Sequence, residues 1–384
     1  MVARGRVIAI DGDAAVVRGA LGDRVVAHAP SGWRPGDLVE LDPPAVVRRH
    51  GGGDYPAPGS EVMRLPRERM SALAARADAL ARVRKFFATD SFLEVETPLV
   101  VPSPGLELHL EAVPAGGAWL VTSPEYQMKR LLAAGFERIY QVCKCFRAGE
   151  RGPHHASEFT MIEWYRAYAA LDAIAADTEQ LVHAVCGDFA RIGERRIDVK
   201  PPWQRVRVRD AMREHAGVHV DGAESAAELA AEVRRAGIAV GEGFAWDDVF
   251  FAAWLARVEP ALAALDRAVL VVDWPAPLAA LARRRDDDAN TALRFEAYVG
   301  GLELANAFDE LVDPVEQRAR FEADRRARAA RGKPVYPIDE RLLAALSEGL
   351  PPSAGIALGF DRLAMLATGA ATIDRVLTFT SEEL

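Results

Sequence analysis

Two apolar segments, residues 138–146 and 158–165, are joined by a polar loop, and this pattern constrains the fold more than any other feature of the sequence. Each segment has the length of a strand, and the loop between them carries charged and histidine side chains. We interpret the pair as a hairpin, which puts antiparallel strands at the centre of the chain. Further apolar segments near 119–122, 292–299 and 354–360 are also predicted to be strands.

Segments with helical periodicity alternate with these strands. From Pro66 to Phe87 apolar residues recur every three or four positions, which predicts a long helix. Short apolar helices are expected over 170–190 and 225–265. The combination indicates an α+β fold in which a mostly antiparallel sheet is flanked by helices.

One late helix has clear end signals. Asp313 is a good N-cap, Pro314 suits the first helical position, and Glu316 completes a capping box. Gly332 stands where a glycine ends many helices. Between these ends the helix carries a row of arginines at positions 318, 320, 325, 326, 328 and 331. We expect them to form a solvated face, paired with the acidic residues of the same helix.

The first part of the chain has a different pattern. Short apolar stretches separated by turn residues, such as Asp11-Gly12, predict four or five short strands in residues 1–48. We expect these strands to form a small β-barrel-like module. The glycines and prolines of residues 49–65 are typical of a linker, so the larger domain is expected over residues 66–384.

Composition and charge argue against several classes of protein. The 384 residues contain no apolar run long enough to cross a bilayer and no signal segment, so we expect a cytoplasmic protein without a membrane partner. The net charge of −9 argues against a broad nucleic-acid surface. A bound nucleotide would not be held by a glycine-rich loop, because no Walker A or Gly-x-Gly-x-x-Gly motif is present. Cysteines 143, 145 and 186 lack the spacing of a four-ligand zinc site, and we interpret them as core residues.

The hairpin carries the first candidate residues for chemistry. Arg147 stands at the end of its first strand, where a planar and permanently charged guanidinium is well placed to hold a phosphate. Phe159 follows the loop and offers a flat face to a nucleobase. Taken alone, a surface arginine and a core phenylalanine would fit the same pattern.

Two carboxylates form a second candidate site. Glu296 and Glu303 flank Gly300-Gly301. A two-residue turn at these glycines would place Tyr298 opposite Glu303 and both carboxylates on one face of the sheet. Such charges repel each other unless a cation or a proton lies between them, and Mg²⁺ would also bridge to phosphates. The alternative is an exposed pair on a solvated face.

A third candidate lies near the C-terminus, where Gly355, Ala357 and Gly359 alternate along a predicted strand. Small residues allow a ligand or another backbone to approach closely. Arg362 would then stand in the first turn of the following helix, where the helix dipole also favours an anion. Tight packing of the strand against a helix is the alternative interpretation.

Together, and in this order, these segments resemble the three motifs of class II aminoacyl-tRNA synthetases, from about residue 66 to the end of the chain. The segments TSPEY from Thr122, EFTMIEWY from Glu158 and LANAFDEL from Leu304 are similar to lysyl-tRNA synthetases. The segments EWYR and AGIALG and the short N-terminal part are most similar to the short paralogues in that family, which ligate (R)-β-lysine to elongation factor P.

The resemblance implies roles for individual residues. A lysine-like amino acid would be activated with ATP as its adenylate, with Arg147 and Arg362 as catalytic residues. The implied ATP contacts are Arg147, Glu150, His155, Phe159 and Arg362. The implied substrate contacts are Glu125, Tyr165, Asn306, Glu310 and Ala357. The implied Mg²⁺ ligands are Glu296 and Glu303. Among the substrate contacts, Glu310 and Tyr165 would receive the ε-ammonium, and Glu125 the other amine.

Several positions depart from the lysyl pattern. The Asn-Glu pair after the motif 2 arginine is replaced by Ala148-Gly149, with Glu150 one place later, and Ala307 replaces a glycine near the pocket. Ala357 stands where the synthetases usually have glycine. Because one methyl group in a pocket shifts selectivity by about 1–3 kcal/mol, we expect this alanine to favour a β-amino acid over α-lysine.

The resemblance also implies partners. The motif 1 segment around residues 70–98 resembles a dimer interface, so a homodimer is expected. Binding of tRNA is not expected, because only about 65 residues precede the core where lysyl-tRNA synthetases carry a larger anticodon-binding barrel. Two alternatives remain open: a truncated lysyl-tRNA synthetase that acts on tRNA, and an inactive synthetase-like regulatory or binding protein. The sequence does not identify a base for transfer to elongation factor P.

Overall fold

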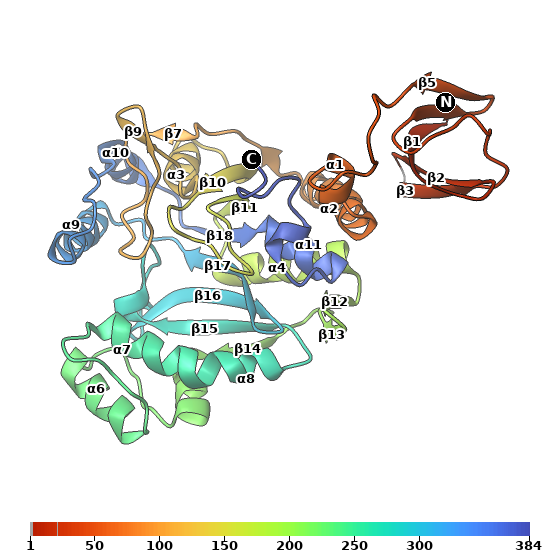
Figure 1. Cartoon of the computed structure of the whole chain (residues 1–384). Coiled ribbons are helices and arrows are strands. Elements are labelled where there is room, and N and C mark those ends of the chain that lie inside the picture. The colour runs from red at the N-terminus through yellow and green to blue at the C-terminus, as the bar shows by residue number, and fades with distance from the viewer. Residues whose placement is uncertain (1–2, 21) are drawn as a thin grey trace. The chain divides into compact units, whose positions relative to one another are not determined.

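The computed structural model describes residues 3–20 and 22–384, and the chain divides into two compact units between Ala77 and Asp78. The boundary falls inside α2 (Arg67–Thr89), which is the long helix predicted from Pro66 onwards (Figure 1). The domain limits expected from the sequence stay a prediction. Among the described residues, no helix combines the length and the apolar character that crossing a membrane requires.

The N-terminal unit contains one antiparallel sheet in the order β3-β2-β1-β4-β5. Its strands are β1 (Arg4–Asp11), β2 (Ala14–Gly19), β3 (Gly22–Val26), β4 (Leu38–Leu41) and β5 (Pro44–Arg48). Trp33 packs with Val7, Val17 and Val39 in a small core. The predicted all-β module is confirmed, but within the described residues no ladder joins β3 to β5, so the expected barrel is an open sheet. Strands β3 and β5 stand at opposite ends of the strand order, and closing the sheet would require a ladder between them.

The C-terminal unit is built on an eight-stranded sheet in the order β14-β15-β16-β17-β18-β11-β10-β6. Its strands are β6 (Leu93–Glu94), β10 (Arg138–Phe146), β11 (Glu158–Ala167), β14 (Gln204–Arg207), β15 (Val269–Pro275), β16 (Thr291–Val299), β17 (Leu302–Asp309) and β18 (Ser353–Gly359). The two outermost pairs are parallel. The central pairs are antiparallel, so the predicted kind of sheet is confirmed.

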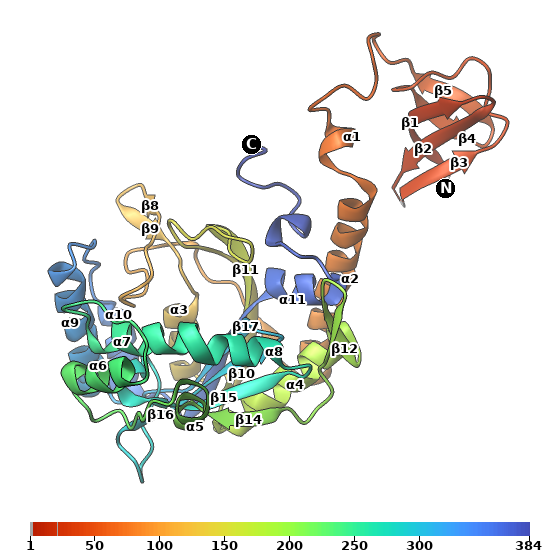
Figure 2. The same ribbon diagram turned by 60° about the horizontal axis from the view of Figure 1, so that its bottom comes forward.

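Helices cover one face of this sheet and leave part of the other face open to a cavity. On the covered face, α4 (Leu171–Cys186) and α11 (Phe360–Thr368) lie beside each other (Figures 1 and 2) and pack with Phe87 of α2 around a large apolar core. Side chains alternate along β11, so Trp164 enters this core whereas its neighbour Tyr165 lines the cavity.

Between β14 and β15 the chain forms a separate layer of helices. This layer contains α6 (Ala226–Arg235), α7 (Trp246–Ala253) and α8 (Glu259–Ala264), with a π-helical turn at Trp254–Val258. Its core is centred on Trp274 of β15, and in Figure 2 the green to cyan helices lie along β15 and β16. The helices predicted for this region are confirmed, whereas β15 itself was not predicted.

Helix α9 (Pro314–Ala330) begins where the sequence predicts. The carboxylate of Asp313 accepts hydrogen bonds from two backbone amides of the first turn, at 2.7 and 3.1 Å. Glu316 does not complete the expected capping box, because it pairs with Arg320 one turn later, at 2.5 Å. The predicted solvated arginine face is wrong at Arg328, whose side chain is fully buried.

The β16–β17 hairpin turns at Gly300-Gly301, as predicted, and Tyr298 pairs with Glu303. Both glycines have positive φ, 59° and 88°, which is typical of the tight hairpin turn that twists with its strands. A Cβ atom at Gly301 would lie 2.4 Å from the Cβ of Ala263 in α8. The turn therefore requires glycine both for its backbone conformation and for lack of space.

We expect Gly301→Ala to lower the free energy of unfolding by about 2–4 kcal/mol, because it combines left-handed backbone strain with overpacking against α8. Gly237→Ala is a matched control, since Gly237 has a φ of 76° with open space around it. That variant should lose only about 1–2 kcal/mol. Urea denaturation of both variants checks the prediction, and equal losses would show that the contact with Ala263 has no effect.

Candidate active site

A cavity of about 470 Å³ lies on the face of the sheet opposite α4. Every site residue predicted from the sequence lines it: Glu125, Arg147, Glu150, His155, Phe159, Tyr165, Glu296, Glu303, Asn306, Glu310, Ala357 and Arg362. They come from α3 (Glu125–Ala133), the β10–β11 hairpin, the three strands β16–β18 and α11. The structure thus brings residues from across the C-terminal unit to one place, and their individual roles stay predictions.

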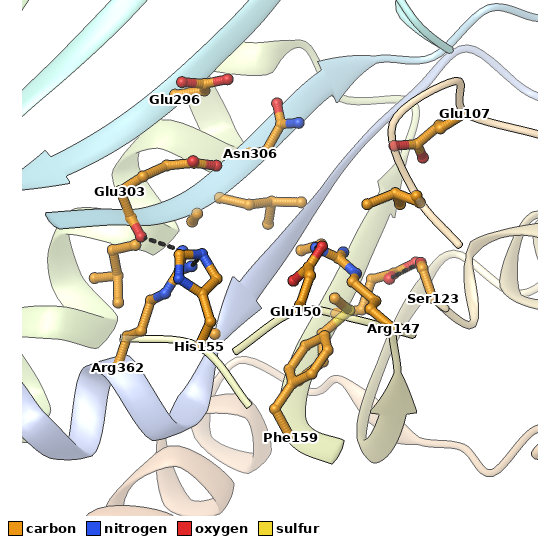
Figure 3. Close-up of a pocket in the computed structure, with 18 of the residues that line it drawn as sticks. Glu107, Ser123, Arg147, Glu150, His155, Phe159, Glu296, Glu303, Asn306 and Arg362 are labelled. Carbon is orange, nitrogen blue, oxygen red and sulfur yellow. Dashed lines mark hydrogen bonds and ion pairs between the residues drawn. The ribbon is translucent and has the colours of Figure 1, made fainter. Parts of the chain in front are cut away.

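Arg147 follows β10 directly, and its guanidinium lacks a close acceptor. Its nearest carboxylate partner is Glu150 at 3.9 Å, and its Nε is buried without a hydrogen bond among the described residues. The guanidinium carbon lies 5.1 Å from the centre of the Phe159 ring, beside it in Figure 3. A permanent charge that is mostly buried and poorly paired favours the binding of an anion.

Arg362, in the first turn of α11, is held at another side of the cavity (Figure 3). Its Nη1 donates to the backbone carbonyl of Glu303 at 2.7 Å, and its Nη2 lies 2.5 Å from Nε2 of His155. Burial and the charge of Arg362 lower the pKa of His155. The imidazole is therefore neutral at pH 7 and can accept the hydrogen bond that orients Arg362.

The two carboxylates on the β16–β17 hairpin interact strongly. Glu296 is buried, accepts a hydrogen bond from the Tyr298 hydroxyl at 2.7 Å and forms an ion pair with Arg294. Burial and the negative charge of Glu303 raise the pKa of Glu296 to about 7. This donor set fits a hard divalent cation. The described residues hold no cluster of three or more histidine, cysteine or acidic side chains that could bind a metal.

A buried ionic cluster forms one end of the cavity. The Nζ atom of Lys129 lies 2.6 Å from Oε1 of Glu125 and 2.5 Å from Oε2 of Glu310, and its side chain is 2% exposed. Burial opposes the charge on Lys129, but the two carboxylates outweigh it and raise its pKa above the usual value. Both carboxylates expected to bind substrate amines are therefore shared with an ammonium of the protein itself.

Glu163 adds a third carboxylate to this end. It accepts hydrogen bonds from the hydroxyls of Ser123, at 2.6 Å, and Tyr165, at 2.7 Å. Burial and the charge of Glu125 raise its pKa to about 8. Three carboxylates and the one ammonium of Lys129 leave a net charge of −2 when all are ionised. A ligand with two ammonium groups would neutralise this end completely.

Strand β18 passes beneath the cavity with little side-chain bulk. A Cβ at Gly355 would lie 2.2 Å from the Tyr165 ring and 2.8 Å from a carboxylate oxygen of Glu310, so glycine is required there. Ala357 is paired with Glu163 on one neighbouring strand and with Asn306 on the other. Its methyl group therefore stands between two residues that line the cavity.

The sequence analysis missed five residues that line or adjoin the cavity. Three of them, Lys129, Glu163 and Arg294, stand two or four residues from a predicted site residue on the same strand or helix. Strand and helix periodicity puts such neighbours on one face and would have identified them. Ser123 and Glu107 lie in irregular segments, where no periodic signal exists.

Comparisons with known proteins agree with this geometry. The family model of class II tRNA synthetases (D, K and N) matches residues 60–383. A curated relative from Klebsiella pneumoniae subsp. pneumoniae, elongation factor P–(R)-β-lysine ligase, is 39% identical over 320 residues, which cover 80% of this chain and 94% of that protein. A protein of the same name from Salmonella dublin is 38% identical with the same coverage.

Glu163 predicts a pH dependence of ligand binding. Because its pKa is about 8, the carboxyl is mostly protonated at pH 7 and must release a proton when an ammonium binds beside it. We expect the dissociation constant of a diamino acid to fall roughly tenfold from pH 6.5 to pH 7.5 and to level off above pH 8. Calorimetry in buffers of different ionisation enthalpy would measure the released proton.

Glu163→Gln is the control for this prediction. The amide cannot ionise, so binding should be weaker at pH 8 and should lose part of its pH dependence, while Glu310, whose pKa burial also raises to about 8, accounts for the rest. A variant that retained the full pH dependence would show that another group titrates.

Proposed function

Because the chain belongs to the class II tRNA synthetases (D, K and N), we propose that it activates (R)-β-lysine with ATP and transfers it to a lysine side chain of elongation factor P. One observation supports the amino acid: three carboxylates lie with the ammonium of Lys129 at one end of the cavity, which suits a substrate with two ammonium groups. The names of the curated relatives support the acceptor. Use of ATP follows from membership in the family.

In the first step a carboxylate oxygen of the amino acid attacks the α-phosphorus of ATP, and pyrophosphate leaves. Arg147 binds the reacting carboxylate and α-phosphate and neutralises the charge that develops between them. Adenine lies between Phe159 and Arg362, while Glu150 and His155 contact the nucleotide. His155 already orients the guanidinium of Arg362. This supports the assignment, since a positioned cation needs little reorganisation when ATP binds.

Glu296 and Glu303 hold Mg²⁺ in this proposal. When bound, the ion would supply neutralisation of the negative charge on the phosphate oxygens. Burial and the charge of Glu303 raise the pKa of Glu296, and a cation between the two carboxylates would relieve the part that is due to Glu303, which supports the assignment.

The amino acid lies over β18 in this proposal. Glu310 and Tyr165 receive the distal ammonium, and Glu125 receives the amine nearer to the carboxylate. Asn306 helps to hold the carboxylate, since its Oδ1 already accepts from Arg294 at 3.0 Å and its N–H groups stay available. The methyl group of Ala357 favours the β-amino acid over α-lysine.

Two further assignments belong to this proposal. Residues 66–384 form the catalytic domain, because every residue assigned above lies within them. Two copies associate through the motif 1 segment, where Leu93 on the edge strand β6 is 50% exposed and Val100 is 52% exposed. Apolar side chains on a sheet edge are often covered by a partner in this way.

Amino-acid-dependent ATP–pyrophosphate exchange tests the first step. We expect exchange with (R)-β-lysine to exceed exchange with α-lysine, and Ala357→Gly to reduce that preference roughly 10-fold or more. Mass spectrometry of elongation factor P after incubation then tests the second step. Preference for α-lysine with transfer to tRNA would favour a truncated lysyl-tRNA synthetase, and no exchange with either amino acid would favour the inactive alternative.

The proposed metal site gives a separate prediction. Glu296→Gln and Glu303→Gln should each slow exchange by at least about 100-fold and raise the Mg²⁺ concentration needed for half-maximal activity, because each removes an anionic ligand. Glu348→Gln on the exposed face of α10 (Glu340–Gly349) is a matched control and should leave both quantities unchanged. An unaltered Mg²⁺ requirement in both site variants would contradict the assignment.

A further inference from the structure

Loop 105–112 contributes a carboxylate that the proposed function has not used. Glu107 lines the cavity, and in Figure 3 its side chain extends from the loop into it. Among the described residues this carboxylate forms no hydrogen bond and no ion pair. Its burial and the charge of Glu125 raise its pKa, so an unpaired acidic group faces the place where the substrates meet.

The backbone of this loop is firmly held. The buried side chain of Arg328 donates from Nη1 to the carbonyls of Glu107, at 2.7 Å, and Leu110, at 2.8 Å. Its guanidinium carbon lies 4.4 Å from the centre of the Tyr336 ring, and the Tyr336 hydroxyl accepts a hydrogen bond from the amide of Ala112 at 2.8 Å. The loop therefore positions the Glu107 side chain through its main chain and leaves the carboxylate free.

The charged groups that face Glu107 come from every neighbouring element. They are Arg147 after β10, Arg294 on β16, Glu125 and Lys129 on α3, and Asp324 on α9. Arg147 is the cation that affects Glu107 most strongly. Glu107 thus lines the same cavity as the residue assigned to the reacting carboxylate and α-phosphate.

The second chemical step has a requirement that this position would meet. The acceptor is a lysine side chain, whose ammonium has a pKa near 10.4 in water and cannot attack until it loses a proton. An ammonium that enters beside Arg147 also needs a negative partner, because burial of an unpaired charge is costly. Glu125 and Glu310 are already shared with Lys129, whereas Glu107 is not.

We propose that Glu107 is a further catalytic residue, which binds the ammonium of the acceptor lysine and removes its proton during the transfer step. The inference rests on the proposed function. The neutral amine attacks the carbonyl carbon of the aminoacyl-adenylate and a C–N bond forms. The C–O bond to the α-phosphate then breaks, its electron pair leaves with AMP, and the second proton of the nitrogen passes to solvent.

The test separates transfer from activation by following enzyme-bound adenylate in a single turnover. The full-length enzyme is loaded with ATP and radiolabelled amino acid, and adenylate decay is measured after addition of elongation factor P or of hydroxylamine. Hydroxylamine is already a neutral amine at pH 7 and needs no base. We expect Glu107→Gln to slow decay with elongation factor P about 100-fold or more and to leave decay with hydroxylamine and pyrophosphate exchange within about threefold.

Two variants serve as controls. Glu107→Asp keeps a carboxylate in the loop and should recover part of the transfer rate. Glu111→Gln changes an acidic residue of the same loop that pairs with Lys333 at 3.5 Å, and it should transfer normally.

Three results would overturn the inference. Equal slowing with elongation factor P and hydroxylamine would indicate a structural role for Glu107. An increased KM for the amino acid in exchange, with normal transfer, would assign Glu107 to the substrate amine. Normal behaviour of Glu107→Gln in every assay would exclude a catalytic role for Glu107 and leave the proposed function intact. Absence of adenylate in the wild-type enzyme would overturn both the inference and the proposed function.

Discussion

The ammonium of Lys129 is the interaction on which the substrate end of the cavity depends. An isolated charge at 2% exposure would cost several kcal/mol, and Glu125 and Glu310 offset that cost at 2.6 and 2.5 Å. The same lysine pairs with both carboxylates, although burial still raises the pKa of Glu310 to about 8. Lys129 offsets the burial of Glu163 only in part, and burial together with the charge of Glu125 raises the pKa of Glu163 to about 8. A ligand with ammonium groups would complete the pairing of these carboxylates, and its binding would release the protons that Glu163 and Glu310 hold near neutral pH.

Much of this arrangement could be predicted from the sequence where a short periodic pattern determined it. The β10–β11 hairpin, the Gly300-Gly301 turn and the pairing of Tyr298 with Glu303 all follow from local rules, and the structure confirms them. The twelve site residues named from the family resemblance all line one cavity. The local predictions succeed because backbone geometry determines which neighbours share a face, whereas the site residues rest on the family resemblance.

The parts that failed depend on contacts between distant segments. Arg328 belongs to a helix whose arginines resemble a solvated row, and its burial depends on carbonyl acceptors outside that helix, at Pro334 and, more than 200 residues away in the chain, at Glu107 and Leu110. The N-terminal strands were predicted, but whether their edges meet depends on strand length and curvature. Glu107 lies in a loop with no period, so its position relative to Arg147 follows only from the assembled structure.

The buried Arg328 also determines how one wall of the cavity behaves. Its guanidinium joins α9 to loop 105–112 through several carbonyl groups, and separating the two would leave a charge unsolvated in the interior. The loop and the helix must therefore open and close as one cooperative unit, with similar protection of their amides from exchange with solvent. We therefore expect the wall formed by α9 and loop 105–112 to stay rigid during catalysis. Any motion that admits ATP or releases AMP is left to the other walls of the cavity.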